Sequence, residues 1–486
     1  MSDQYVDQRR RKLQGLRDLG TDPYGARFGG VLPNQYVRNK VERLGLEPGQ
    51  SSDADRARAA GRIVLLRDMG RLCFMTIRDS SGDLQLGISQ KAVGSDAWQA
   101  VKLLDLGDLV GAEGRLGRTK TGEITLWVDS FCVLCKSLRP LPEKWHGLQD
   151  VELRYRQRYV DLFANPDVMR VFQQRLVIIE TVRQWLRERN FVEVETPTLQ
   201  PIYGGAAARP FTTHHNTLDI DLYLRISPEL YLKRLMVGGM ERVFEISRNF
   251  RNEGIDTEHY PEFTMLEAYQ AYGDYHDMMD LAEGVTVTAI DRLGGGYQRP
   301  FGPKTIDFAP PWRRATFAEL FATHVGVDMF DHPAVRRAAD QQQIDHADMA
   351  DDLVVQALFE RNVEPNLVDP TFVLDFPASL CPLTRRHPDD PRLALRFELY
   401  VSGIELANAY TELNDPDIQR QTLSQQLRGE GDETMRVMDE DFLRALEYGM
   451  PPAGGIGIGI DRLVMLLTNS TSIRDVILFP LQRSKG

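Results

Sequence analysis

The spacing of hydrophobic and polar positions divides the first part of the chain into two kinds of structure. Residues 4–19 place apolar side chains at helical spacing around a basic run, RRRK. From Gly61 the pattern changes to short alternating segments, among them GRIVLLRDMG, LCFMTIRD and EITLWVDSF, separated by Gly, Asp and Ser. Five such segments predict a small β-barrel of the OB type over residues 57–137, preceded by a helical extension over residues 1–56.

Beyond the barrel, the pattern predicts a linker and then an α+β body. The segment LRPLPEKWHGLQD contains a Pro-Leu-Pro turn and indicates a linker over residues 138–165. A long helical pattern, VMRVFQQRLVIIETVRQWLRERN, opens a body over residues 166–486. Strands and one helix follow, and strands return near the C-terminus. Residues 281–395 have weaker helical patterns and turns, which we interpret as an insertion.

Composition indicates a globular chain with an uneven distribution of charge. The chain has 486 residues, of which 42% are hydrophobic and 26% are charged. The net charge of −12 hides an asymmetry, since residues 1–140 hold 22 basic and 17 acidic residues, which leaves 36 against 53 for the remainder. A mildly basic module that touches phosphate beside an acidic body fits this distribution.

The hydropathy of the chain indicates no membrane partner. No apolar stretch approaches the roughly 18 residues that a bilayer span needs. The opening residues, MSDQYVDQRRRK, lack the apolar core of a signal peptide. We therefore expect a cytoplasmic protein.

The barrel contains candidate contacts to nucleic acid. Barrels of this type bind single strands by stacking bases on aromatic side chains and reading base edges with polar groups. Phe74, in a predicted strand, and Gln85 are the residues that fit these two roles. The same pattern also fits a core position for Phe74, so this alternative stays open at the level of the sequence.

A first hairpin in the body combines pocket-like chemistry on one strand face. ERVFEISRNFRNEG and HYPEFTMLEAY are two alternating runs that flank a polar loop. In the second run, the strand period of two puts Phe263, Met265, Glu267 and Tyr269 on one face. This mixture is typical of a pocket. Arg251, at the end of the first strand, could clamp a phosphate or carboxylate, or form a structural ion pair.

A second hairpin, ALRFELYVSGIELANAYTELND, turns at Ser402-Gly403. A two-residue loop places Glu398 opposite Ala407 and Glu405 opposite Tyr400, with both carboxylates on one face. Two carboxylates so close repel unless a divalent cation lies between them. The alternative is a pair of solvated surface carboxylates.

A third segment, PPAGGIGIGIDRLVMLL, is a glycine-rich strand that leads into a helix. Its glycine spacing does not fit the GxGxxG dinucleotide motif. Glycines in a strand indicate close approach of a ligand to the backbone. Arg462, at the start of the helix, is then placed to meet an anionic or aromatic group of that ligand.

With PTLQ after the long helix, these segments resemble the signature motifs of class II aminoacyl-tRNA synthetases, most closely the lysine enzymes. The matching stretches include KTGEI, PELYLKRL, RNFRNEG, PEFTMLE, ELNDP and GIGIGIDR. The resemblance implies an antiparallel catalytic sheet of six or seven strands. It implies ATP-dependent ligation of L-lysine to tRNA(Lys) through a lysyl-adenylate, with Mg2+ as cofactor. It also implies a homodimer with Pro197 at the interface.

The resemblance also implies roles for individual residues. Catalysis is assigned to Arg251 and Arg462. The ATP site would comprise Arg251, Glu253, His259, Phe263, Glu405, Gly459 and Arg462. The lysine site would comprise Gly205, Glu229, Glu267, Tyr269, Asn408, Tyr410, Glu412 and Gly457. Magnesium would be held by Glu398 and Glu405, and the anticodon by Phe74, Gln85 and Glu123.

The amino-acid pocket can also be argued physically. Lysine has two ammonium groups, and a desolvated cation needs carboxylate partners. The related aspartate enzymes have Gln where this chain has Glu229, which argues against aspartate as the substrate. Two alternatives remain open. The segment ELANAY resembles short relatives that attach β-lysine to a protein, although those lack the barrel and carry Ala at the position of Gly457. A nucleic-acid-binding paralogue without activity is the other.

Two local features depart from simple expectation. The family usually has His-Asn before PEF, but this chain has His259-Tyr260, so a contact from residue 260 to ATP is in doubt. Glu405 and Asn408 are three residues apart and would face opposite sides of a regular strand. One cleft needs both, so we predict a β-bulge or sharp twist between them, eased by the small side chain of Ala407.

Overall fold

The computed structural model describes residues 2–141, 148, 150–206, 208–426 and 438–482, and divides into two compact units. The first comprises residues 1–154 and 159–165, and the second comprises residues 155–158 and 166–486. Each is described by itself. Within the described ranges, no helix is both long and apolar enough to span a bilayer.

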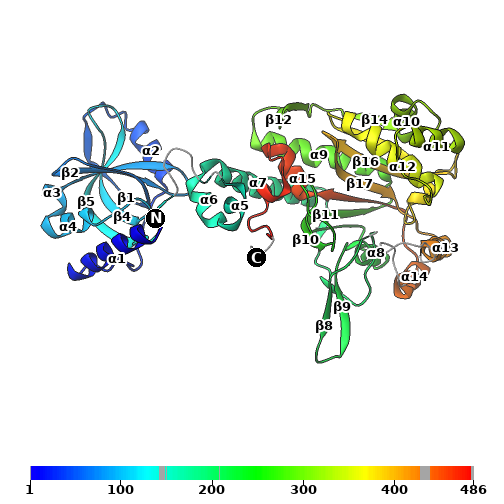
Figure 1. Cartoon of the computed structure of the whole chain (residues 1–486), viewed down its shortest axis with the longest axis horizontal. Helices are drawn as coiled ribbons and strands as arrows, with labels where there is room; N and C mark the ends of the chain where they lie inside the picture. Colours follow the sequence, from blue (N-terminus) through cyan, green and yellow to red (C-terminus); the bar gives the residue numbers. More distant parts are fainter. Residues whose placement is uncertain (1, 142–147, 149, 207, 427–437, 483–486) are drawn as a thin grey trace. The chain divides into compact units, whose positions relative to one another are not determined.

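The first unit is a closed five-stranded barrel with strand order β1-β2-β3-β5-β4 (Figure 1). Its strands are β1 (Ser51–Asp68), β2 (Leu72–Arg78), β3 (Asp83–Ser89), β4 (Leu109–Arg118) and β5 (Ile124–Cys135). Four helices accompany them: α1 (Ser2–Asp18), α2 (Asn34–Arg43), α3 (Gln90–Val93) and α4 (Ser95–Lys102). Alternate residues, such as Cys73, Met75 and Ile77, are buried inside the barrel. The predicted barrel is confirmed, although β1 begins within the stretch expected to be helical.

The second unit is built on an eight-stranded sheet with order β14-β15-β16-β17-β18-β11-β10-β6. The strands are β6 (Val192–Glu193), β10 (Arg242–Phe250), β11 (Glu262–Ala271), β14 (Arg313–Thr316), β15 (Thr371–Pro377), β16 (Leu393–Val401), β17 (Ile404–Thr411) and β18 (Ala453–Gly459). The expectation of six or seven antiparallel strands is corrected at both edges. There β14 pairs with β15, and β6 with β10, in parallel. These edge strands are four and two residues long, too short to give a clear alternating pattern.

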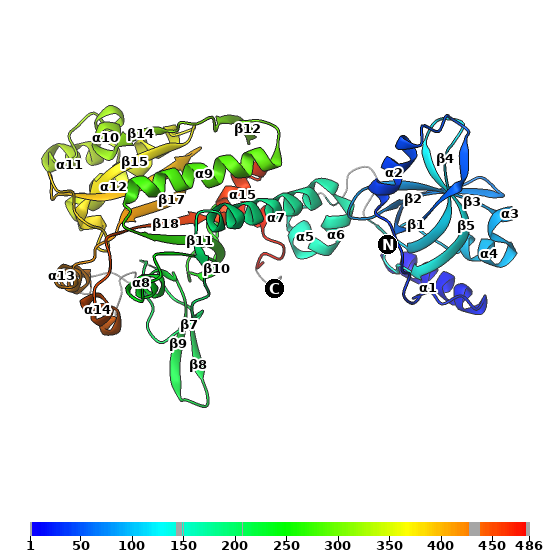
Figure 2. The same cartoon turned by 180° about the vertical axis from the view of Figure 1, so that it is seen from behind.

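Helices cover one face of this sheet. The long helices α7 (Pro166–Arg187) and α9 (Tyr275–Leu293) pack in the main hydrophobic core with α15 (Ile460–Thr468). Figure 2 shows α9 lying along the sheet, over β17 and β18. On β11, Leu266 and Ala268 point into this core. The residues that alternate with them along the strand, such as Glu267, therefore point to the opposite face.

The expectation of a single insertion over residues 281–395 is also corrected, because α9 belongs to the main core and β14 and β15 belong to the sheet. Between those two strands, α10 (Phe317–Val325), α11 (His332–Gln341), α12 (Asp351–Asn362) and η1 (Glu364–Asn366) form a separate cluster against the ends of β15 and β16. A short hairpin, β12 (Gln298–Phe301) and β13 (Lys304–Asp307), follows α9.

The remaining elements lie in the predicted linker or around the sheet. Helices α5 (Val151–Arg156) and α6 (Arg158–Ala164) occupy the stretch expected as linker. A three-stranded sheet contains β7 (Leu199–Gln200), β8 (Thr212–His215) and β9 (Ile220–Leu224). The other elements are α8 (Glu229–Val237), η2 (Ala378–Leu380), α13 (Pro416–Gln426), α14 (Glu440–Glu447) and α16 (Ile473–Val476).

The second hairpin contains the predicted irregularity. Ser402 and Gly403 have φ values of 58° and 83°, which close a two-residue turn between β16 and β17. Tyr400 pairs with Glu405 as expected, but Leu399 pairs with Ala407, so Leu406 is an extra residue. The bulge is therefore confirmed. The expected pairing of Glu398 with Ala407 is wrong, because the extra residue shifts the register and places Asn408 opposite Glu398.

Candidate functional site

Two adjoining chambers lie on the face of the sheet opposite α9. Arg251, Met265, Asn408 and Gly457 line both chambers. Apart from the bulge at Leu406, the strands that form the wall alternate: the side chains of Ala409, Ile456 and other buried residues pack in the core, and their neighbours in sequence face the chambers. The strand period of two therefore brings residues from β11, β17 and β18 into one continuous cleft.

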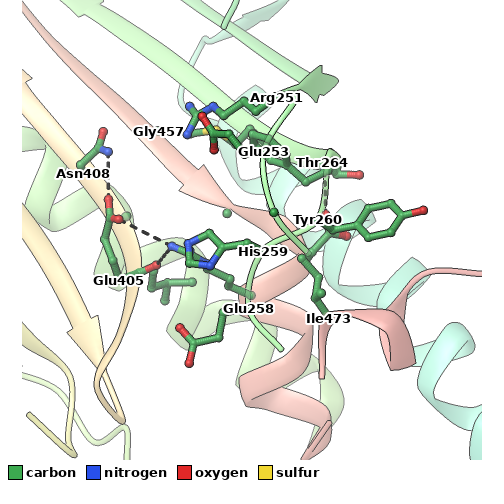
Figure 3. Close-up of a pocket in the computed structure, with 18 residues that line it drawn as sticks. Arg251, Glu253, Glu258, His259, Tyr260, Thr264, Glu405, Asn408, Gly457 and Ile473 are labelled. Atoms are coloured by element: carbon green, nitrogen blue, oxygen red, sulfur yellow. Dashed lines mark hydrogen bonds and ion pairs between the residues drawn. The ribbon is translucent and has the colours of Figure 1, made fainter. Parts of the chain in front are cut away.

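The first chamber gathers residues from the loop after β10, from β17 and from the start of α15. Its lining includes all the predicted nucleotide residues: Arg251, Glu253, His259, Phe263, Glu405, Gly459 and Arg462. Figure 3 shows the side chains of Asn408 and Glu405 approaching each other on one side, with Arg251 and Glu253 on another. The Asn408 amide donates to Glu405 Oε1 at 3.0 Å, which the bulge makes possible.

Arg462 is held at the mouth of this chamber by its neighbours. Its Nη1 donates to the backbone carbonyl of Glu405 at 2.6 Å, and its Nη2 donates to His259 Nε2 at 3.1 Å. His259 Nδ1 lies 2.8 Å from Asp256 Oδ2. This chain of contacts orients the guanidinium group toward the loop that follows β10.

Arg251 lies at the junction of the two chambers. Its guanidinium group lies over the Phe263 ring, 5.1 Å from the ring centroid. Among the residues that the structure describes, its buried Nε has no hydrogen-bond partner. Burial lowers the pKa of Arg251, against the influence of Glu253 and Glu405. A half-buried cation with a buried, unused donor is suited to receive an anion that reaches both chambers.

The hydroxyl group of Tyr260 is hydrogen-bonded to the C-terminal segment. Its side chain is 8% exposed, and its hydroxyl accepts a hydrogen bond from the backbone N–H of Leu481. In Figure 3 the ring of Tyr260 points away from Glu405 and His259. The tyrosine at position 260, where the family usually has asparagine, therefore holds the C-terminal segment through this hydrogen bond.

The second chamber is lined by carboxylates and phenols. Gly205, Glu229, Glu267, Tyr269 and Tyr410 lie in its wall. Burial and the neighbouring Glu229 raise the pKa of Glu267 to about 8. Ser227 Oγ donates to Glu267 Oε1 at 2.9 Å and accepts from the backbone N–H of Glu229 at 3.0 Å. A chamber with buried carboxylates in its wall is suited to a cation.

Glu412 is the predicted lysine residue that does not line the chamber wall. It is 1% exposed, and its Oε2 lies 2.5 Å from Nζ of Lys233. Lys233 also donates to Glu229 Oε1 at 2.6 Å. Sequence reasoning missed Lys233, because its spacing of four from Glu229 is that of an ordinary ion pair on a helix surface. Only the fold shows that this pair is buried.

Glu398 and Glu405 lie on the same sheet face, as predicted, but in different surroundings. Glu398 is buried, accepts from Arg396, and accepts from the Tyr400 hydroxyl at 2.5 Å. Burial raises the pKa of Glu398, opposed by Arg396 and reinforced by Glu405. For Glu405, burial is outweighed by Arg462 and Arg396, which hold its pKa below the usual value.

The site's donors fit a magnesium ion that arrives with a phosphate ligand. Two carboxylates offer hard oxygen ligands, and Glu405 faces the first chamber. Over the described ranges, no group of three or more His, Cys, Asp and Glu side chains is arranged to hold a metal ion. Mg2+ is usually bound by one or two carboxylates together with substrate phosphates and water, so two carboxylates suffice.

The outer face of the barrel carries the predicted nucleic-acid residues. Phe74 is half-buried and makes an edge contact with Trp127, with ring centroids 6.0 Å apart. Gln85 Nε2 donates to Thr125 Oγ1 at 2.8 Å. Glu123 is exposed and pairs with Arg38 at 3.2 Å. Trp127 was missed by sequence reasoning. Gly87, the strand partner of Trp127, could have indicated that a large ring lies over it, since a Cβ at Gly87 would lie 2.6 Å from the Trp127 ring.

Pro197 lies in an exposed segment that carries apolar side chains. Val192 and Leu199, on either side of it, are 51% and 47% exposed. On the neighbouring long helix, Leu176 is 67% exposed. These side chains are a candidate contact surface for a second subunit.

Comparison with known proteins defines the class of this fold and site. Residues 150–483 match the family model described as tRNA synthetases class II (D, K and N), and residues 57–134 match that of the OB-fold nucleic acid binding domain. The first match covers well over half of the chain. The chain therefore belongs to the class II tRNA synthetases of the D, K and N group.

Within this group, several relatives that are similar to the chain over its length are lysine enzymes. The chain is 51% identical to the lysine–tRNA ligase of Pelotomaculum thermopropionicum, over 98% of this chain and 94% of that protein. It is 49% identical to that of Carboxydothermus hydrogenoformans, over 99% and 98% of the two chains. It is 46% identical to that of Staphylococcus epidermidis over the full length of both.

Proposed function

We infer that this chain is a lysine–tRNA ligase, which joins L-lysine to tRNA(Lys) at the expense of ATP through a lysyl-adenylate. The observation that carries this function is Arg251, a half-buried cation with a buried, unused donor at the junction of an acidic chamber and a second chamber. The reaction joins a carboxylate to a phosphate. Because Arg251 lines both chambers, its guanidinium group can contact a carboxylate in one and a phosphate in the other. The lysine–tRNA ligases to which the chain is similar over its whole length support the same function.

The acidic chamber takes the amino acid. The carboxylate of lysine meets Arg251, and its α-ammonium group lies between Glu229 and the backbone at Gly205. The ε-ammonium group lies toward Tyr269 and Glu412, with Glu267, Asn408, Tyr410 and Gly457 forming the remaining wall. Two carboxylates in the chamber wall, Glu229 and Glu267, and a third behind it, Glu412, stabilise two ammonium groups and disfavour an anionic side chain such as that of aspartate.

The first chamber takes ATP. Adenine stacks between Phe263 and Arg462, and Glu253 and His259 contact the nucleotide. Gly459 lets the nucleotide approach the backbone of β18. Glu398 and Glu405 would hold Mg2+, which neutralises phosphate charge when bound. In the bound state Arg396 would share Glu398 with the ion.

The reaction proceeds by adenylyl transfer and then acyl transfer, and neither step needs a protein nucleophile. A carboxylate oxygen of lysine attacks the α-phosphorus of ATP, and the bond to the bridging oxygen breaks to release pyrophosphate. The terminal ribose hydroxyl of the tRNA then attacks the lysyl carbonyl carbon, and AMP leaves. Arg251 and Arg462 position the groups and stabilise the charge that develops on the α-phosphate.

The barrel binds the anticodon, and two chains form a homodimer. Phe74 stacks on a base, while Gln85 and Glu123 read base edges. The apolar side chains around Pro197 are covered by the same segment of a second chain, as in other isologous dimers.

Two alternative functions would each be expected to have residues or domains that differ from those of this chain. A ligase that attaches β-lysine to a protein is favoured only by the segment ELANAY, and it would need no anticodon-binding barrel. A Cβ at Gly457 would lie 2.6 Å from Met265 Cε, so the Ala of those relatives would narrow this cleft. An inactive paralogue would be expected to lack Arg251 or the paired carboxylates, which are all in place.

Transfer to RNA is the experiment that tests the acceptor. The purified chain, ATP and labelled lysine are incubated with bulk tRNA, and acid-precipitable label is counted. We expect label on tRNA that is lost after mild base, as an ester is. Adenylate formation without label on tRNA would point to another acceptor.

A further inference from the structure

A lysine of the protein itself lies behind the acidic chamber. Lys233 is on the second turn of α8 and is fully buried. Its ammonium group lies 2.6 Å from Glu229 Oε1 and 2.5 Å from Glu412 Oε2. Glu229 lines the chamber, whereas Lys233 and Glu412 are outside the lining. Lys233 therefore joins a wall residue to a residue one layer deeper.

The ammonium group of Lys233 also balances the charge of this region. Glu229, Glu267 and Glu412 together bring three carboxylates, and Lys233 brings one ammonium group. When all are ionised, two negative charges remain, which match the two ammonium groups of the lysine substrate. The two arginines of the chamber wall are matched separately, Arg251 by the substrate carboxylate and Arg396 by Glu398. Without Lys233, Glu229 and Glu412 would be buried side by side with no fixed cation between them, and one of them would take up a proton.

The contacts of Lys233 also fix the position of the deeper carboxylate. Glu412 Oε1 lies against Gly455, where an added Cβ would be 2.0 Å away. Gly455 is part of the chamber wall. Glu412 therefore spans from Lys233 on one side to the floor of the chamber on the other. A shift of the Lys233 ammonium group would move both carboxylates.

We propose that Lys233 is a positioning residue for lysine recognition, which holds Glu229 and Glu412 in place and sets the chamber's charge to suit a substrate with two ammonium groups. This inference rests on the proposed use of the chamber for lysine. It assigns Lys233 no contact with the substrate. It requires that Lys233 affect the binding of lysine much more than that of ATP.

The barrel contains a matched control. Lys136 is also fully buried and bridges two carboxylates, Asp105 and Asp108, at 2.6 and 2.7 Å. It belongs to the other unit and is outside the two chambers. Its substitution measures the general cost of losing a buried, doubly paired lysine.

The test compares Lys233→Ala, Lys233→Arg and Lys136→Ala in lysine-dependent pyrophosphate exchange. For Lys233→Ala we expect the KM for lysine to rise at least about tenfold, while the KM for ATP changes less than about threefold. n-Propylamine has the three methylenes and ammonium group that this variant lacks, and should lower the KM for lysine again. Lys233→Arg keeps the positive charge, so its KM for lysine should be closer to that of the wild type than the KM of Lys233→Ala is. Lys136→Ala should leave both KM values unchanged.

Several results would overturn the inference. An unchanged KM for lysine in Lys233→Ala would do so. A parallel rise of both KM values that propylamine does not reverse would also do so. If Lys233→Ala does not fold, a Lys233→Arg variant whose two KM values rise together decides against the proposal. Glu267→Gln distinguishes failure of the Lys233 proposal from failure of the proposed function. An unchanged KM for lysine in this variant would show that lysine does not bind in the chamber.

Discussion

Lysine binding should release a proton from Glu267, and its affinity should therefore depend on pH. Burial and the neighbouring Glu229 raise the pKa of Glu267 to about 8, so the group is mostly protonated at pH 7 in the free enzyme. An ammonium group in the chamber favours the ionised carboxylate. Because the cation binds the deprotonated form, affinity for lysine rises as pH rises toward about 8, and levels off above the pKa of the free enzyme.

The size of the effect follows from the raised pKa. Each pH unit below the pKa of the free enzyme costs about 1.4 kcal/mol of binding free energy, as long as the pKa in the complex is lower still. Between pH 6 and pH 8 the affinity should therefore rise by up to about fiftyfold, or about 2.3 kcal/mol, because half of the Glu267 side chains are still protonated at pH 8. At pH 7 a group with a pKa near 8 is about 90% protonated, so binding should release about 0.9 proton from it.

Calorimetric titration of lysine in two buffers of different ionisation enthalpy measures the released protons directly. Glu412, whose pKa burial raises to about 7 against the influence of Lys233, contributes to the same signal. Glu267→Gln is therefore the reference, and the difference between wild type and variant is the quantity of interest. Equal proton release in both proteins, or a wild-type affinity that is flat from about pH 6 to 8, would refute the reasoning.

Four substitutions test other parts of the account. Glu412→Gln should weaken lysine binding by about 2 to 4 kcal/mol and ATP binding little, because Lys233 loses a charged partner; equal KM values for lysine in variant and wild type would remove Glu412 from the pocket. Phe74→Ala and Gln85→Ala should impair transfer to tRNA but not pyrophosphate exchange, with about 1 to 3 kcal/mol lost per unstacked base for Phe74; a matching loss in both assays would indicate unfolding instead. Gly455→Ala would place a Cβ 2.0 Å from Glu412 Oε1 and 2.5 Å from the Tyr269 ring, so lysine-dependent exchange should fall sharply, and normal exchange in a folded variant would contradict the position of Glu412.

The strand period of two predicted much of the cleft from the sequence. It placed Phe263, Met265, Glu267 and Tyr269 on one face, and these side chains line the chambers. It also showed that Glu405 and Asn408 could share a cleft only if the strand were irregular, and the bulge at Leu406 is that irregularity. These predictions held because they depend on alternation within one strand, a property that tertiary contacts rarely change.

Features that depend on neighbours far along the chain were not predictable. The bulge shifted the partner of Glu398 from Ala407 to Asn408, and no local pattern specifies which residue of a strand is extra. The burial of Lys233, and its contact with Glu412, depend on side chains from other elements. Parallel edge strands of two to four residues carry no periodicity of their own.

Amino-acid-dependent exchange of labelled pyrophosphate into ATP tests the central claim most directly. The assay needs no tRNA, so it isolates the chemistry of the two chambers. We predict exchange with lysine and with none of the other standard amino acids, and its loss in Arg251→Ala. Exchange that depends on aspartate or asparagine, or lysine-dependent exchange that survives in Arg251→Ala, would contradict the account.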